Sequence, residues 1–244
     1  MVITSLTNAK VKQWLKYKDK KYREQDECFL IEGEHLVQEA HAAGLLLYTI
    51  QRIGDTLLFP DYPTYEVTEE ILKKIGNCKS GATIMALCKY KPCPDNLDKK
   101  VIILDDVQDP GNVGTIIRTG LSFGYGTVIL SNHCVDIYNE KLIRSTQGAI
   151  FHMNIVRTDI EPLLATLKNE QYHIYATSLQ KAKPLSVIEP KEKHAIIFGN
   201  EGNGICKEVL ALSDECIKIE MKTFDSLNVA VAAGICMYHL QMNK

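Results

Sequence analysis

From residue 101 onward, short apolar segments alternate with segments of helical periodicity. Apolar segments of four or five residues are typical of buried strands. We expect strands at 101–104, 127–130, 152–156, 173–177, 195–198 and 216–219. We expect helices between them, at about 113–123, 140–147, 160–169, 205–212 and 227–241. Six strands alternating with helices predict an α/β fold, with a mostly parallel six-stranded sheet covered by helices on both faces.

The first ninety residues have a different order of elements. We expect a basic helix at about 7–24, helices at 34–43 and 68–75, and strands at 28–31, 46–52, 64–67 and 83–90. Pro92 and Pro94 lie in a polar stretch, where they disfavour a helix and favour an extended linker. The sequence therefore predicts a smaller α/β domain at 1–92, a linker at 93–100 and a larger domain at 101–244.

The cysteines and the apolar runs indicate the cellular setting. Eight cysteines show no CxxC and no paired spacing, which favours free thiols in a reducing cytosol. Cys88 and Cys93 would need two further ligands to bind zinc, so we expect no metal site. The N-terminus has no apolar signal core, and the run at 229–238 is too short to span a bilayer. We expect a cytoplasmic protein.

Three polar loops follow predicted strands of the larger domain, where open α/β sheets bind ligands. The first loop leads into a helix that carries Asn112 and Arg118, the second is glycine-rich and contains Glu201, and the third opens the final helix. The glycines follow the order GxxGxG, which argues against a Rossmann dinucleotide site. Taken singly, Asn112 could cap a helix, Arg118 could be a surface arginine and the glycines could form a turn. Together the loops predict a site.

These loops resemble the three motifs of the SpoU-type (TrmH-like) RNA ribose 2′-O-methyltransferases of the SPOUT superfamily. The motifs are Asn112 to Arg118, Gly199-Asn200-Glu201-Gly202 and Ser226-Leu227-Asn228, in the family's order, and the similarity covers roughly 101–241. The segment Phe29-Leu30-Ile31-Glu32-Gly33 also resembles the start of an accessory substrate-binding domain. The resemblance implies a trefoil-knotted fold and methylation of structured RNA by S-adenosylmethionine, with ribosomal RNA favoured over transfer RNA.

The resemblance also assigns roles to residues. It implies that the cofactor is held by Thr177, Gly199, Ile219, Met221 and Leu227. It implies a catalytic group made of Arg118, Asn112, Glu201, Asn228 and Ser226.

Arginine is a poor general base because its free pKa is above about 12. We therefore expect Arg118 to bind the RNA phosphate and the developing alkoxide, while a base role stays open. Asn228 is expected to fix Arg118 or the substrate ribose, and Glu201 to order that network. One segment departs from the family pattern. Glu220 stands where family members commonly have proline, and the loop before Ser226 is one residue shorter.

The charge distribution suggests where RNA would bind. The whole chain has a net charge of −2, so an RNA-binding surface must be a local patch. Basic residues dominate positions 1–24, and the predicted RNA-binding side chains are Lys10, Lys12, Lys16, Lys20 and Arg23. A solvated helix face is the alternative.

The final helix is apolar around much of its circumference and therefore needs cover on most sides. Family members pair through this region, which implies a homodimer. Burial in the monomer's own core is the alternative.

Two other functions remain open. A catalytically impaired, RNA-binding ribosome-assembly factor fits the shortened 219–226 loop, but the presence of Arg118, Glu201 and Asn228 speaks against it. A nucleotide- or sugar-binding metabolic enzyme fits the composition, but it leaves the basic N-terminus and Arg118 unexplained.

Overall fold

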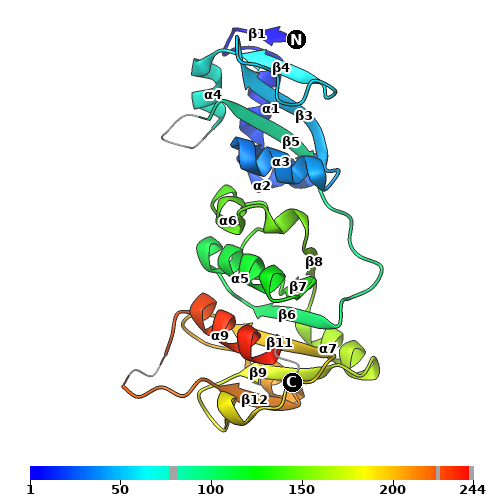
Figure 1. The fold of residues 1–244 in the computed structure, drawn as a ribbon, viewed down its shortest axis with the longest axis vertical. Helices are drawn as coiled ribbons and strands as arrows, with labels where there is room; N and C mark the ends of the chain where they lie inside the picture. Colours follow the sequence, from blue (N-terminus) through cyan, green and yellow to red (C-terminus); the bar gives the residue numbers. More distant parts are fainter. Residues whose placement is uncertain (77–81, 224–225, 242–244) are drawn as a thin grey trace. The chain divides into compact units, whose positions relative to one another are not determined.

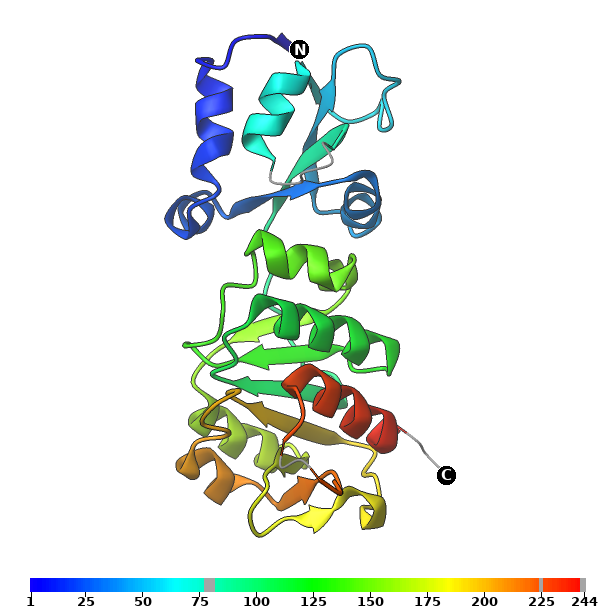
Figure 2. The same cartoon turned by 90° about the vertical axis from the view of Figure 1, so that its left-hand side faces the viewer.

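The computed structural model describes residues 1–76, 82–223 and 226–241. The chain forms two compact units, shown in Figures 1 and 2. One unit combines Met1–Pro92 with Tyr138–Phe151, and the other combines Cys93–Ile137 with His152–Lys244. Tyr138–Phe151, which the sequence places inside the larger domain, therefore packs with the first unit.

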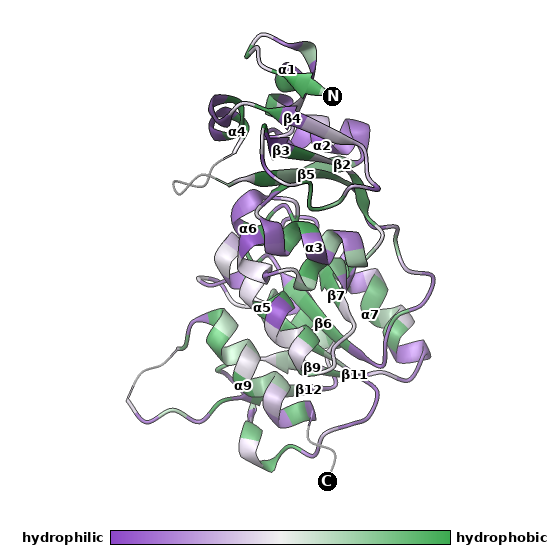
Figure 3. Cartoon of the chain, turned by 45° about the horizontal axis from the view of Figure 1, so that its top comes forward, coloured by the Kyte–Doolittle hydropathy of each residue, from purple (hydrophilic) through white to green (hydrophobic). Residues whose placement is uncertain are grey.

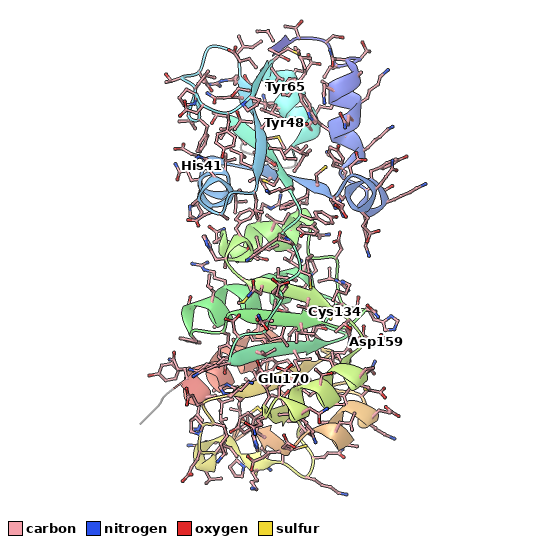
Figure 4. All side chains as sticks on the ribbon, turned by 90° about the vertical axis from the view of Figure 1, so that its right-hand side faces the viewer. His41, Tyr48, Tyr65, Cys134, Asp159 and Glu170 are labelled. Carbon is pink, nitrogen blue, oxygen red and sulfur yellow. The ribbon has the colours of Figure 1, made fainter. Side chains whose placement is uncertain are left out.

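Over its described residues, 1–76, 82–92 and 138–151, the first unit has a five-stranded sheet in the order β1-β4-β3-β5-β2. Its strands are β1 (Val2–Ile3), β2 (Cys28–Glu32), β3 (Leu46–Arg52), β4 (Thr64–Val67) and β5 (Ile84–Lys89). Its helices are α1 (Ala9–Lys16), α2 (Lys20–Asp26), α3 (Glu34–Ala42), α4 (Glu69–Ile75) and α6 (Glu140–Thr146), followed by the short 3-10 helix η1 (Ala149–Phe151). Trp14 is fully buried, and its Nε1 donates a hydrogen bond to the hydroxyl of Tyr48 at 2.9 Å. Figure 4 labels Tyr48 and its neighbour Tyr65, whose ring meets Trp14 edge-on.

The single basic helix predicted at 7–24 is wrong, because α1 ends at Lys16 and α2 begins at Lys20. Asp19 caps α2 by accepting a hydrogen bond from the amide of Lys21. The Nη1 of Arg23 donates to the carbonyl of Tyr17 at 2.6 Å, just past the end of α1. The chain bends between α1 and α2, and Arg23 is directed inward. The basic side chains of this segment therefore do not lie along one face of a single helix.

The second unit has, in the described part of the chain, a seven-stranded sheet in the order β10-β12-β9-β11-β6-β7-β8. Its strands are β6 (Lys100–Asp105), β7 (Thr127–Leu130), β8 (Asn154–Arg157), β9 (His173–Thr177), β10 (Lys183–Pro184), β11 (His194–Gly199) and β12 (Glu215–Lys218). Every pairing is parallel, which confirms the predicted α/β class with a parallel sheet. The predicted count of six strands is wrong. The additional strand β10 has two residues, one of them proline, and is too short to show an apolar alternation.

Helices cover both faces of this sheet. The helices are α5 (Pro110–Ser122), α7 (Ile160–Asn169), α8 (Lys207–Leu212) and α9 (Val229–Gln241), with the 3-10 helix η2 (Leu185–Val187). Val101 and Ile103 of β6 pack with residues of α7 and α8. Ile102 points the other way, because a Cβ added at Gly120 of α5 would lie 2.3 Å from it. Figure 2 shows α5 (green) and α9 (red) on one side of the sheet.

The strands of this sheet are apolar along most of their length. Figure 3 shows β6 and β7 in green, and all four residues of β7 are buried. Because all strands are parallel, their carboxyl ends meet at one edge, where the polar loops follow. None of the helices in residues 1–76, 82–223 and 226–241 has both the length and the apolar character needed to cross a bilayer.

Candidate active site

The first polar loop leads from β6 into α5. Asp109 caps the helix, since its Oδ1 accepts a hydrogen bond from the amide of Asn112 at 2.8 Å. Pro110 is the first helical residue, where a missing amide hydrogen costs nothing. The interpretation of Asn112 as the helix cap is therefore wrong. Asn112 lies inside the first turn, and its side chain makes contacts with the other two loops.

A chain of hydrogen bonds joins the three loops. The Nδ2 of Asn112 donates to Oε1 of Glu201 at 2.9 Å. The Nδ2 of Asn228 donates to Oδ1 of Asn112, also at 2.9 Å. The backbone amides of Gln108 and Asp109 approach the Glu201 carboxylate at 3.5 and 3.4 Å. Residues 89 and 116 positions further along the chain thus meet around the side-chain amide of Asn112.

Glu201 is ionised in this network. Burial by itself would raise the pKa of its carboxyl group, but hydrogen bonds from the Asn112 side chain and from backbone amides lower the pKa below its ordinary value. These donors stabilise the charged form. A carboxylate held in this way orients its donors and is a poor proton carrier at neutral pH.

Asn228 has two roles. Its Oδ1 accepts hydrogen bonds from the amides of Ala230 and Val231, so it caps α9 while its Nδ2 contacts Asn112. The helix expected at about 227–241 therefore begins later, at Val229, with Asn228 as its cap. Ser226 and Leu227 are exposed and precede the helix.

Arg118 lies on the exposed side of α5. Within the described residues, no side chain or carbonyl hydrogen-bonds to its guanidinium group. The expected contact between Asn228 and Arg118 is absent there, because the Asn228 amide is directed to Asn112. The guanidinium therefore faces solvent, where an anionic ligand can reach it.

The glycine-rich loop is a tight hairpin. Asn200 and Gly204 exchange backbone hydrogen bonds at 3.0 and 2.9 Å, and Gly204 has a φ of +71°. A Cβ at Gly199 would lie 2.2 Å from the backbone carbon of Gly204. Glycine is required at 199 because the hairpin folds back onto this residue.

The residues expected to hold the cofactor follow neighbouring strands. Thr177 ends β9, Gly199 ends β11, and Ile219 follows β12, and these three strands are adjacent in the sheet. The Thr177 hydroxyl donates to the carbonyl of Ile197 at 3.0 Å. Ile219 and Met221 are half-buried, whereas Leu227 is 40% exposed. A Cβ at Gly204 would meet no atom within 4 Å, so the backbone there is open to a ligand. The expected cofactor-binding residues of β9, β11 and β12 therefore lie at the same edge of the sheet.

The loop that departs from the family pattern has its own anchor. The hydroxyl of Ser186 donates a hydrogen bond to the carboxylate of Glu220. The pKa of Glu220 is lowered, first by this bond and also by backbone hydrogen bonds from Ser186 and Leu185. The side chain at the position of the family's proline therefore ties this loop to η2.

The side chains expected to bind RNA differ in their exposure to solvent. Lys12, Lys16 and Lys20 are exposed on α1 and α2. Lys10 is half-buried, with its Nζ 5.8 Å from the ring centres of Tyr48 and Tyr65. Arg23 is only 7% exposed and is directed to the Tyr17 carbonyl, so its assignment to an RNA surface is wrong.

Sequence reasoning missed Gln108 and Asp109. The Asp-Pro pair at 109–110 is a known helix start and could have identified Asp109 as the cap. No sequence signal marks Gln108, whose side chain donates to Oδ1 of Asp106 and to the carbonyl of His133.

A parallel α/β sheet with three linked polar loops at its carboxyl edge agrees with the SpoU-type RNA methyltransferases, whose motifs these loops resemble. Residues 99–238 match the family model described as the SpoU rRNA Methylase family, and the chain belongs to this family. It is an RNA methyltransferase that uses S-adenosylmethionine. Residues 8–86 match the MRM3-like substrate binding domain.

Two relatives match nearly the whole chain. One is the 23S rRNA (guanosine(2553)-2′-O)-methyltransferase RlmP of Bacillus subtilis, 37% identical over 98% of each chain. Another is an uncharacterized tRNA/rRNA methyltransferase of Synechocystis, 29% identical over 99% of this chain and 94% of the relative. Among solved structures, the AdoMet-bound rRNA methyltransferase of Sinorhizobium meliloti superposes with a TM-score of 0.89 at 26% identity, covering 99% of this chain and 97% of that one.

Proposed function

We propose that this protein transfers the methyl group of S-adenosylmethionine to a ribose 2′-hydroxyl of ribosomal RNA. The observation that carries the proposal is the hydrogen-bonded chain from Asn228 through Asn112 to Glu201, which links all three loops. The near full-length similarity to a 2′-O-methyltransferase of 23S ribosomal RNA supports the same reaction and RNA class.

In this proposal each side chain has a distinct task. The cofactor supplies an electrophilic methyl group, held against the main chain near Thr177, Gly199, Ile219, Met221 and Leu227. The exposed Arg118 binds the RNA phosphate and the developing negative charge on the 2′-oxygen, a task that suits a permanent cation with several donors. Glu201 orders Asn112 and Asn228, so that the ribose and the methyl donor meet in one geometry. Ser226, exposed just before α9, contacts the same ligands.

The proposal extends to the assembly and to the division of labour. Three exposed apolar side chains on α9 support a homodimer through the second unit, and they are Val231, Ile235 and Tyr238. The exposed lysines of the first unit support RNA binding there. Free thiols among the described cysteines suit a reducing cytoplasm. The family's trefoil knot is part of the same proposal.

The test is a map of ribose methylation in ribosomal and transfer RNA from cells with and without this protein. We expect one ribosomal 2′-O-methyl group to disappear, and to return with the wild-type gene but not with Arg118→Ala. Loss of a transfer RNA methyl group instead would contradict the assignment to ribosomal RNA. An unchanged map, together with no binding of S-adenosylmethionine in calorimetry, would favour the ribosome-assembly factor.

A further inference from the structure

The backbone at Asp106 has a conformation that residues other than glycine rarely adopt. Its φ is +61°, in the left-handed region. Side chains from two other loops hold it there. The amide of Asp106 donates to Oγ of Ser131 at 3.0 Å, and its carbonyl accepts from Nδ2 of Asn200 at 2.8 Å. Such a conformation persists where the surroundings enforce it, and it is common at functional sites.

This turn leads directly into the active-site network. Gln108 and Asp109, two and three residues further on, direct their amides at the Glu201 carboxylate. Asn200, which holds the Asp106 carbonyl, is the residue before Glu201. The position of Asp106 therefore affects both the donors and the acceptor of the network.

The loop after β7, residues 131–135, is hydrogen-bonded to the turn at Asp106 and to the two residues after it. Besides the Ser131 bond to Asp106, the amide of Val135 donates to the carbonyl of Val107 at 3.1 Å. The carbonyl of His133 accepts a hydrogen bond from Nε2 of Gln108. Each of the three residues 106–108 is thus bonded to this loop.

Arg157, the last residue of β8, holds the loop 131–135 in turn. Its Nη1 donates to the carbonyls of Ser131, Asn132 and Cys134 at 2.9, 3.3 and 3.0 Å, and its Nη2 donates to that of Val135 at 2.6 Å. A planar guanidinium can donate hydrogen bonds to four carbonyls at once only while the loop surrounds it. The side chain of Asn132 also bonds to Asp159, and Figure 4 labels Asp159 and Cys134 at this edge.

We propose that Arg157 is a positioning residue for methyl transfer. It holds the loop 131–135, this loop holds the left-handed turn at Asp106, and the turn sets the geometry of Asn112 and Glu201. Arg157 touches neither substrate nor cofactor in this role. The inference rests on the proposed function for its kinetic consequence, whereas the structural chain is independent of it.

The kinetic test compares Arg157→Ala and Arg157→Lys with the wild type on its RNA. Because the cofactor edge lies on other strands, we expect kcat to fall at least about tenfold, with the S-adenosylmethionine Kd changing less than about twofold. Lysine should not substitute, since one ammonium group cannot serve four carbonyls. Added guanidinium should restore part of the kcat of Arg157→Ala. As a matched control, Lys168→Ala removes a charged contact of α7 with Asp214 and should leave kcat unchanged.

Hydrogen exchange supplies a measurement that does not need activity. In Arg157→Lys, the amides of Asp106 and Val135 should exchange at least about tenfold faster, while those of β6 and β11 should not change. A double variant with Asp106→Gly should regain kcat, because glycine adopts the left-handed turn without support.

Wild-type kcat in Arg157→Ala, or unchanged exchange at Asp106, would overturn the proposal. A second pattern would also overturn it, because it indicates general destabilisation. In this pattern guanidinium does not restore kcat, and the S-adenosylmethionine affinity and Tm fall together with kcat. If the wild type itself fails to methylate RNA, the proposed function fails, while the exchange experiment still decides whether Arg157 supports the turn.

Discussion

Arg118 combines an exposed guanidinium with a position six residues along α5 from Asn112. We predict that Arg118→Ala binds S-adenosylmethionine normally but loses methyl transfer by about 10²-fold or more, the loss expected when a charge-stabilising donor is removed. Single-turnover methylation and calorimetry would measure the two effects. Arg118→Lys keeps the charge without the planar fork and should be intermediate. Near-normal turnover of the alanine variant would contradict this role.

Gly199 allows a second test. A methyl group at this position would overlap the backbone of Gly204 and Ile205. Gly199→Ala should therefore open the hairpin, lower Tm by several degrees and weaken cofactor binding, as measured by thermal unfolding and calorimetry. Gly202→Ala is the matched control, because its added carbon would lie 3.5 Å from Oδ1 of Asn200 and fits. Equal behaviour of the two variants would show that the hairpin tolerates a side chain at 199.

The contacts of some side chains can be predicted from the sequence, whereas those of others cannot. Asn112, Glu201 and Asn228 were predicted to meet because each belongs to a motif at the end of an element, and their contacts agree. The contacts of Arg157 are with carbonyls more than twenty residues away, and carbonyls have no sequence signature. Arg23 was predicted to be exposed because of its charge alone. In the structure its guanidinium is buried, because it donates a hydrogen bond to the carbonyl of Tyr17 at the bend.

Among the strands, β11 begins with a fully buried histidine. His194 lies 2.6 Å by its Nδ1 from the carbonyl of Lys191 and 2.8 Å by its Nε2 from the hydroxyl of Tyr125. A carbonyl only accepts, so Nδ1 carries the hydrogen and Nε2 accepts from the tyrosine. Burial lowers the pKa of His194 from 6.5 to about 4.

This shift makes stability depend on pH. The unfolded chain binds a proton below pH 6.5, whereas the folded chain does so only near pH 4. The stabilisation is therefore complete above pH 6.5 and is lost as the pH falls towards 4, by up to about 1.4 kcal/mol per pH unit. Urea unfolding would measure the free energy of unfolding at pH 7 and at pH 5. The decrease in this free energy from pH 7 to pH 5 should be about 2 kcal/mol smaller in His194→Gln than in the wild type. The same replacement at the exposed His41 serves as the control variant.

The helix α9 makes a prediction about assembly. Val231, Ile235 and Tyr238 are 51%, 40% and 56% exposed and share one side of the helix, since they are four and three residues apart. Ile235→Glu should place a charge in the proposed dimer contact and give a particle of 27.4 kDa in light scattering at micromolar concentration, half the wild-type mass. Val187→Glu, at a side chain 65% exposed on η2, is the control. A wild-type monomer would contradict the dimer.

The elements themselves were predicted unevenly. The strands β3 and β4 and the helix α7 have the predicted bounds, because turn-forming or polar residues lie within two positions of each end, among them Gly44, Pro63 and Asp159. The basic helix was predicted as one piece because its lysines continue through the bend at residues 17–19. Polarity does not reveal a bend that a buried arginine stabilises.

For the chain as a whole, RNA affinity should depend on the first unit. Changing the exposed Lys12, Lys16 and Lys20 together to glutamate should weaken RNA binding and reduce the slope of log K against log salt by about one per lost phosphate contact. S-adenosylmethionine binding should not change, and Lys207→Glu in the second unit serves as control. An unchanged slope would identify the lysines as a solvated surface. Charge reversal is cleaner than deleting residues 1–92, which would remove Phe29 from its contact with Tyr138 at 4.4 Å.

The place of β11 has a consequence for how the protein is made. This strand lies between β6 and β9 in the sheet, although both precede it in the chain. Until residue 199 has left the ribosome, β6 and β9 each present an unpaired edge to the cell. Pairing of parallel strands so far apart in sequence is slow. We therefore expect refolding in seconds or longer, with aggregation competing during synthesis and helper proteins needed most in the interval before β11 inserts.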